Sequence, residues 1–295
     1  MKIITQVKDY LVPHLYSIRN YSDGPLEFVN IRSDAQELLF DWHKMHSPTY
    51  HLGSIATPYI EYLAKINFAK RKLHANYFSM AIGHPCEYLK ESKTTGRKVA
   101  HTFPLSRKEF LKLSKERISL AKNHFEYVGV ENLDYNEGGP GEISAYELAN
   151  GERITTPDFI NEFISKFKVN LLLDIGHLEV SAKRERLDPQ NYLEMLPLKK
   201  IYEIHFHHAT EVGGVLRDTH QPPTDLEYYL LDRILSKANP EYITLEFKCG
   251  IETYIKNLKI LKEMLPRKKI NNTWAKAQGI HNKNVNSYQT KVGKN

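Results

Sequence analysis

Histidine and carboxylate residues recur near the ends of short apolar segments along this chain. Imidazole nitrogen and carboxylate oxygen, without thiolate, are ligands that suit iron, manganese or zinc used for chemistry. Because one ion takes three or four protein ligands, a set this large indicates two or three ions bridged by carboxylates. The candidate metal ligands are His51, His84, Glu131, Asp174, His177, His205, Asp218, His220 and Glu246.

Each candidate also has a purely structural interpretation. A single histidine at the end of a strand is commonly a hydrogen-bonded core residue, and Glu131 or Asp174 alone could cap the following helix. The whole set favours a metal centre, because buried carboxylates without cations are costly. His207 is the weakest candidate, since it would share a strand face with His205 but could be replaced as a ligand by His208. Structural roles are expected for His46, His74, His101 and His124.

Strand-like segments alternate with amphipathic, helix-like segments over most of the chain. The strand-like segments are 2–7, 26–31, 49–53, 77–82, 127–132, 170–175, 201–207 and 242–247. The helix-like segments are 57–75, 106–124, 156–167, 225–238 and 251–265, and Thr156 and Pro157 form a plausible helix start. This α/β pattern predicts a (β/α)8 TIM barrel, in which the active site lies at the C-terminal ends of the strands. An open doubly wound sheet is the alternative, weakened by the lack of a glycine-rich phosphate turn after the first strand.

One long irregular segment, 132–153, follows the fifth predicted strand and contains a glycine-rich turn at 138–141. Loops of this length are commonly functional. We therefore expect this loop to close over the substrate. Tyr135 and Tyr146 would either line it or simply pack within it.

Composition and charge narrow the class of protein. The chain has 295 residues, and its 2 cysteines exclude a disulfide scaffold and a cysteine-ligated zinc ribbon. We expect no membrane span and no secretion signal, hence a cytoplasmic protein. The net charge is +6, but residues 267–295 carry seven basic and no acidic side chains, which leaves about −1 on residues 1–266. We therefore predict a catalytic barrel over 1–266 and a loosely ordered basic tail over 267–295, and we do not expect a nucleic-acid partner.

Several sequence stretches carry a specific resemblance. The segment LLLDIGHLEVSAKRERLDPQNYLEMLPLKKIYEIHFHHA, followed by RDTHQPP and TLEF, resembles the multinuclear non-haem iron-dependent oxidative enzymes, including the MbnB-type enzymes of methanobactin biosynthesis and the TglH-type enzymes. The upstream stretches YHLGS, MAIGH and VEN fit the same order, so the similarity covers roughly residues 25–265.

The resemblance implies a xylose-isomerase-like TIM barrel that holds two or three iron ions of mixed Fe2+ and Fe3+ state. Such enzymes use O2 to modify a ribosomally made precursor peptide (RiPP biosynthesis), usually at cysteine, and a separate recognition protein often presents the peptide. Glu131 would bridge two ions, and Glu131, Asp174 and His177 would form the catalytic set. His177 stands where many members have asparagine. The ligands implied by the resemblance are His51, His84, Glu131, Asp174, His205, Asp218, His220 and Glu246.

Three other functions remain open from the sequence. A single-metal sugar isomerase or epimerase would use the same barrel, but it has no need for the surplus of histidines. An endonuclease-IV-like zinc nuclease would need a basic groove over the body, whereas the basic excess lies in the tail. A non-catalytic binding protein with a vestigial site is the third alternative, and the completeness of the ligand set argues against it.

Overall fold

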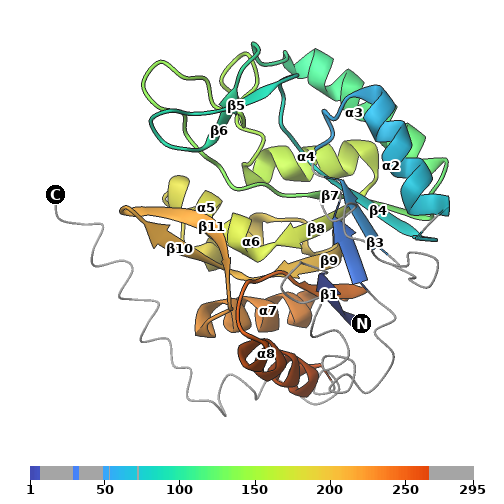
Figure 1. Cartoon of the computed structure of the whole chain (residues 1–295), viewed down its shortest axis with the longest axis vertical. Coiled ribbons are helices and arrows are strands. Elements are labelled where there is room, and N and C mark those ends of the chain that lie inside the picture. Colours follow the sequence, from blue (N-terminus) through green and yellow to red (C-terminus); the bar gives the residue numbers. More distant parts are fainter. Residues whose placement is uncertain (7–28, 33–48, 53, 72, 266–295) are drawn as a thin grey trace.

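The computed structural model describes residues 1–6, 29–32, 49–52, 54–71 and 73–265. Eight parallel strands close into a barrel in the order β1-β12-β9-β8-β7-β4-β3-β2 (Figure 1). The strands are β1 (Lys2–Gln6), β2 (Val29–Arg32), β3 (Thr49–Leu52), β4 (Tyr77–Ala81), β7 (Tyr127–Glu131), β8 (Asn170–Asp174), β9 (Ile201–Phe206) and β12 (Tyr242–Leu245). The predicted TIM barrel is confirmed, and each strand falls within a predicted segment or within a residue of its end.

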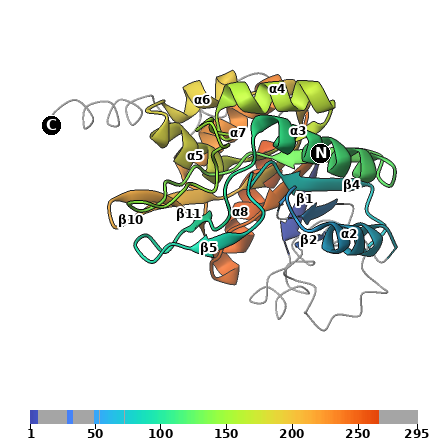
Figure 2. The same cartoon turned by 90° about the horizontal axis from the view of Figure 1, so that it is seen from above.

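Helices cover the outside of the barrel, as Figure 2 shows from above. Five of them match the predicted helix-like segments: α2 (Tyr59–Arg71), α3 (Arg107–Lys122), α4 (Pro157–Phe167), α7 (Asp225–Lys237) and α8 (Ile251–Met264). Local caps fix where they begin. The predicted cap is present at α4, where the side chain of Thr156 accepts a hydrogen bond from the amide of Phe159 and Pro157 opens the first turn. Capping boxes at Ser106 and Thr224 start α3 and α7.

Two helices were not predicted, α5 (Ile175–Arg184) and α6 (Pro189–Met195). Helix α5 starts directly after β8, and its residues from Ile175 to Ala182 are all buried. Because the helix begins at the residue directly after the strand, no loop marks the boundary between them in the sequence.

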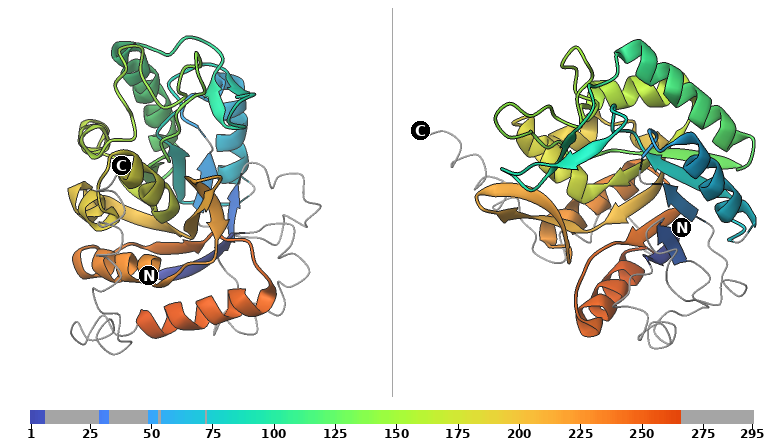
Figure 3. Two further views of the ribbon diagram at one scale, coloured as in Figure 1. Left: turned by 90° about the vertical axis from the view of Figure 1, so that its left-hand side faces the viewer. Right: turned by 45° about the horizontal axis from the view of Figure 1, so that its top comes forward.

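Two antiparallel hairpins stand outside the barrel sheet. Strands β5 (Leu89–Glu91) and β6 (Lys98–Ala100) form one hairpin, and β10 (His208–Val212) and β11 (Val215–Gln221) form the other. The second turns at Gly213 and Gly214, both with positive φ, which is the backbone that a tight hairpin turn requires. Figure 3 shows both hairpins on the same side of the barrel.

No helix in the described ranges is long and apolar enough to cross a membrane. The predicted basic tail, 267–295, lies outside the described residues, as does most of the segment before β3.

The barrel wall requires a residue without a side chain at Gly129, in the middle of β7. A Cβ atom at this position would overlap the Tyr77 ring of the neighbouring strand β4. Tyr77 is fully buried and packs against Tyr202 with ring centroids 4.6 Å apart.

We therefore expect Gly129→Ala to lower the free energy of unfolding by about 1–3 kcal/mol, the usual cost of overpacking a core. Urea denaturation followed by circular dichroism measures this change. Gly250→Ala is the control, because nothing lies within 4 Å of a Cβ placed there, and it should cost no more than about 1 kcal/mol. Equal losses in the two variants would contradict the packing argument.

Candidate metal centre

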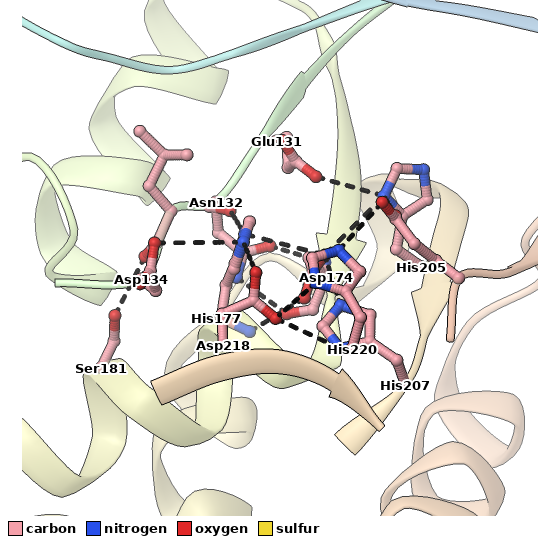
Figure 4. A network of polar contacts seen from close by, with 12 residues as sticks. Glu131, Asn132, Asp134, Asp174, His177, Ser181, His205, His207, Asp218 and His220 are labelled. Atoms are coloured by element: carbon pink, nitrogen blue, oxygen red, sulfur yellow. Dashed lines mark hydrogen bonds and ion pairs between the residues drawn. The ribbon is translucent and has the colours of Figure 1, made fainter. Parts of the chain in front are cut away.

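The C-terminal ends of neighbouring strands bring the predicted histidines and carboxylates together (Figure 4). His51 lies in β3 and His205 in β9, while Glu131 and Asp174 are the last residues of β7 and β8. Their side chains are almost completely buried, as is that of Glu246 after β12. His177 comes from the first turn of α5, and Asp218 and His220 come from β11.

Glu131 joins two of the histidines. Its Oε2 lies 3.1 Å from His51 Nε2, and its Oε1 lies 3.2 Å from His205 Nδ1. The other ring nitrogen of His51 lies 3.0 Å from the hydroxyl of Ser79. Burial alone would raise the pKa of Glu131, but the charges and hydrogen bonds of His51 and His205 outweigh it and hold that pKa far below its ordinary value.

Asp174 is surrounded by three imidazoles. Its Oδ2 lies 2.9 Å from His207 Nε2 and 3.7 Å from both His177 Nδ1 and His205 Nδ1. Its Oδ1 accepts a hydrogen bond of 2.8 Å from the backbone amide of His177, so the same carboxylate also caps α5. The capping role and the place in the cluster therefore coexist in one residue.

Asp218 and Glu246 close the cluster on the side of the β10–β11 hairpin. Asp218 lies 3.2 Å from His220 Nδ1 and 3.4 Å from His177 Nε2. Glu246 lies 3.0 Å from His220 Nε2 and 2.7 Å from His205 Nδ1. Burial would lower the pKa of His177 and His205, but the surrounding carboxylates raise both pKa values well above the ordinary one.

Two residues of this cluster were not among the predicted ligands. His207, the weakest candidate in the sequence, lies inside the cluster, fully buried, with its ring stacked on His220 at 4.4 Å between centroids. A Cβ at Gly176 would overlap the His207 ring, so this glycine makes room for it. Asp134 lies 4.0 Å from His177 Nε2, and burial raises its pKa to about 6. Strand alternation pointed to His207 beside His205, whereas nothing in the sequence singled out Asp134.

His84 stands apart from the other predicted ligands. Within the described residues, no ion pair or hydrogen bond joins its ring to theirs; the ring packs edge-on against Tyr146, with centroids 5.0 Å apart. Its buried Nδ1 forms no hydrogen bond to any described residue. Burial, followed by the charge of His177, lowers the pKa of His84 to about 4. The imidazole is therefore neutral at neutral pH, which is the form that can bind a metal.

The irregular segment 132–153, which was expected to close over the substrate, packs against neighbouring elements. Tyr135 and Tyr146 are both buried, and the hydroxyl of Tyr135 donates a hydrogen bond of 2.5 Å to Glu147. A bridge between Val99 and Ser144 ties the segment to the β5–β6 hairpin. Both tyrosines therefore pack within the segment. Tyr146 also contacts His84, a predicted ligand.

The donor set fits bound metal ions. Among the described residues, four groups of side chains have ligand atoms within 4.8 Å of one another. Three of them share Asp174 and His207 and so form one continuous cluster: Glu131 with Asp174 and His177, Asp174 with His207 and Glu246, and His207 with Asp218 and His220. The fourth, Glu179 with His208 and Glu227, shares no residue with the others. Within the described part of the chain, the buried atoms Glu131 Oε1, His207 Nδ1 and Asp218 Oδ1 have ion-pair neighbours at 3.2–3.5 Å but no well-directed hydrogen bond. Buried polar atoms normally form such bonds, and a cation would satisfy these atoms.

Comparison with known proteins places the chain in a family. A family model described as "RiPP precursor modification enzyme MbnB/TglH/ChrH" matches residues 43–264. The chain belongs to this family. The resemblance inferred from the sequence is thereby confirmed.

Curated relatives carry little functional information. A "UPF0276 protein" of Caulobacter vibrioides is 31% identical over 107 residues, which is 35% of this chain and 38% of the relative. One from Acaryochloris marina is 28% identical over 113 residues, 38% of this chain and 41% of the relative. The alignments thus span about two fifths of these relatives.

Solved structures support the fold. A xylose isomerase domain containing protein from Salmonella typhimurium has a TM-score of 0.60 at 10% identity, covering 89% of this chain and 97% of that one. A xylose isomerase domain protein from Planctomyces limnophilus has a TM-score of 0.53 at 15% identity, covering 91% and 97%. At these identities the likeness shows a xylose-isomerase-like barrel and nothing of the activity.

A separate polar network lies outside the cluster. His208 Nδ1 is 3.0 Å from Glu227 Oε1 and 3.3 Å from Glu179 Oε2, and both carboxylates are buried. Burial, with the charge of Glu227, raises the pKa of Glu179 well above its ordinary value, whereas Glu227 keeps a lowered pKa because His208 and Glu179 outweigh burial. Of the two carboxyl groups, Glu179 is therefore the one that holds a proton more readily, and Glu227 is the one that carries the charge paired with His208.

Glu179→Gln should then cost less than about 1 kcal/mol of unfolding free energy, because glutamine keeps a neutral donor and acceptor at this site. Glu227→Gln should cost about 3–5 kcal/mol, because the His208 cation loses its buried counter-charge. Thermal and urea unfolding of the two isosteric variants measure the difference. A larger loss for Glu179→Gln would reverse the assignment of the proton.

Proposed function

We propose that this chain is an iron-dependent oxidative enzyme that uses O2 to modify a ribosomally made precursor peptide at cysteine. The observation that carries the proposal is the continuous cluster of buried imidazoles and carboxylates, in which Asp174 and His207 each belong to two ligand groups. A single ion needs three or four ligands, so this cluster supports two or three. Membership in the RiPP-modifying family supports a peptide as the substrate.

The proposed ligands are those expected from the sequence, with His207 added to them. The set is His51, His84, Glu131, Asp174, His177, His205, His207, Asp218, His220 and Glu246. Bound iron would supply the one-electron chemistry needed to reduce O2, which amino-acid side chains lack. The donors are nitrogen and oxygen only, in keeping with non-haem iron.

The chain fixes the orientation of individual ligands. His177 Nδ1 lies 2.8 Å from the backbone carbonyl oxygen of Asn132, which accepts a hydrogen bond from it and leaves Nε2 directed to Asp218. His51 Nδ1 is engaged by Ser79, which leaves Nε2 toward Glu131. Such outer contacts set the tautomer and ring orientation of histidine ligands.

The chain also supports the proposed catalytic roles of Glu131, Asp174 and His177. Glu131 reaches His51 with one oxygen and His205 with the other, which is the disposition that a carboxylate bridging two ions needs. Asp174 lies among three histidines, and His177 faces both Asp174 and Asp218. The burial of these groups excludes water from the reacting atoms. The substrate peptide, O2 and a possible peptide-recognition protein are the partners that we propose.

The metal content tests this proposal. Protein purified without oxygen from iron-supplemented cells should contain two or three iron ions per chain, with coupled ferric and ferrous signals in the Mössbauer spectrum. A single zinc, manganese or magnesium ion per chain would instead favour a sugar isomerase or epimerase, an activity in keeping with the xylose-isomerase domain neighbours, or a zinc nuclease. Sugar turnover and a gel shift with abasic DNA would then separate these two.

Glu131→Ala should lose most of the bound iron while the barrel still folds, because two proposed ions would lose their shared carboxylate. Elemental analysis and far-ultraviolet circular dichroism follow the two properties. Glu179→Gln is the matched control, since it changes a buried carboxylate outside the cluster, and it should retain the iron. A full iron complement in Glu131→Ala would refute the bridging role.

A further inference from the structure

Glu203 is a buried carboxylate that the proposed centre does not use. It lies in β9 two residues before His205, so strand alternation places the two side chains on the same face of the strand. Neither residue is exposed to water. The register of the barrel pairs His205 with Thr244 of β12, and the Thr244 hydroxyl donates a hydrogen bond of 2.5 Å to Glu203 Oε1. Glu203 is thus held next to His205, toward the N-terminal end of the strand.

The ring of His205 lies between Glu203 and the carboxylates of the proposed centre. Its Nδ1 is 3.2 Å from Glu131 Oε1 and 2.7 Å from Glu246 Oε2. Its other nitrogen, Nε2, is 3.5 Å from Glu203 Oε1. The imidazole therefore presents one nitrogen to the centre and the other to a carboxylate that is not a proposed ligand.

This outer partner of His205 differs from those of two other proposed ligands. The outer nitrogen of His51 meets the hydroxyl of Ser79, and that of His177 meets the backbone carbonyl of Asn132. Both of these partners are uncharged. An outer carboxylate fixes the tautomer and orientation of a histidine ligand as they do, and it also raises the basicity of the nitrogen that faces the metal.

We propose that Glu203 is a positioning residue for His205, which holds Nδ1 toward the metal and strengthens this nitrogen as a ligand. This inference rests on the proposed function, because it assigns a role toward the ions that this function requires. Thr244 supports the role, since its hydroxyl engages the same carboxylate oxygen that faces the ring. A stronger imidazole donor stabilises ferric more than ferrous iron, so Glu203 lowers the reduction potential of the ion that His205 binds.

Removal of the charge of Glu203 tests the proposal. Glu203→Gln keeps the volume and an acceptor oxygen but removes the negative charge. Competition between the iron-loaded, full-length protein and a chelator of Fe2+, without oxygen, measures metal affinity. At least one bound ion should lose about 10–100-fold in affinity, the usual cost of losing an outer-shell partner. Glu179→Gln is the matched control, because it makes the same change at a buried carboxylate outside the cluster, and it should keep the wild-type affinity.

The midpoint potential separates this role from simple packing. Glu203→Gln should lower the ratio of ferric to ferrous affinity about tenfold, which raises the midpoint potential by about 59 mV for a one-electron couple. A variant that only loosened the barrel would weaken the binding of both oxidation states and leave the potential unchanged. Redox titration of the iron-loaded protein measures the potential, and circular dichroism shows whether each variant is folded.

Thr244→Val provides a second, milder variant. It keeps the charge of Glu203 but removes the hydroxyl that holds the carboxylate, so metal affinity should fall in the same direction by a smaller factor, about threefold or more. This variant decides the question if Glu203→Gln does not fold, in which case wild-type affinity in Thr244→Val would overturn the inference.

For a folded Glu203→Gln, the inference is overturned by wild-type metal affinity, or by a lower affinity with an unchanged midpoint potential. The outcome is separable from that of the proposed function, because neither measurement uses peptide or O2. If the purified protein holds Zn2+ in place of iron, the proposed function fails, and chelator competition on the zinc-loaded protein still decides the role of Glu203. Wild-type affinity and potential in a Glu203→Gln protein that oxidises peptide would remove only this inference.

Discussion

A carboxylate with no exposure to water needs surrounding cations or hydrogen-bond donors. Asp174 is such a carboxylate, and the barrel surrounds it with both. Its two oxygens engage the backbone of α5 and the rings of three histidines. Moving Asp174 would remove the cap of α5 and the common neighbour of His177, His205 and His207 together. The geometry of the centre is thus tied to the geometry of the fold at one residue.

Other residues at the C-terminal ends of the strands are arranged around Asp174. Gly176, the second residue of α5, leaves the space that the His207 ring occupies. Asn132 bonds to both the amide and the carbonyl of Asp174 and also offers its own carbonyl oxygen to His177. The segment after β7 therefore fixes strand β8 and a proposed ligand at once.

The alternation of short apolar segments with amphipathic ones was enough to predict the barrel, because covered parallel strands and amphipathic helices leave distinct patterns. It did not reveal α5, because that helix follows β8 with no loop between them to mark its start. The hairpin around Asp218 and His220 lies outside the predicted strand-like segments, although Gly213 and Gly214 are a typical turn pair. Eight of the nine predicted ligands contact one another in the cluster, because the ends of parallel strands meet at one rim. His84 and His207 depend on side-chain packing around Tyr146 and Gly176, which spacing along the chain does not encode.

The acidic interior of this site needs positive charge to balance it. Glu131, Asp174, Asp218 and Glu246 all contact histidines there. Without metal, these carboxylates raise the pKa values of His177 and His205 and so favour their protonated forms. Metal ions in the proposed centre would neutralise the carboxylates and displace the protons, so the same side chains would serve protons and metal in turn.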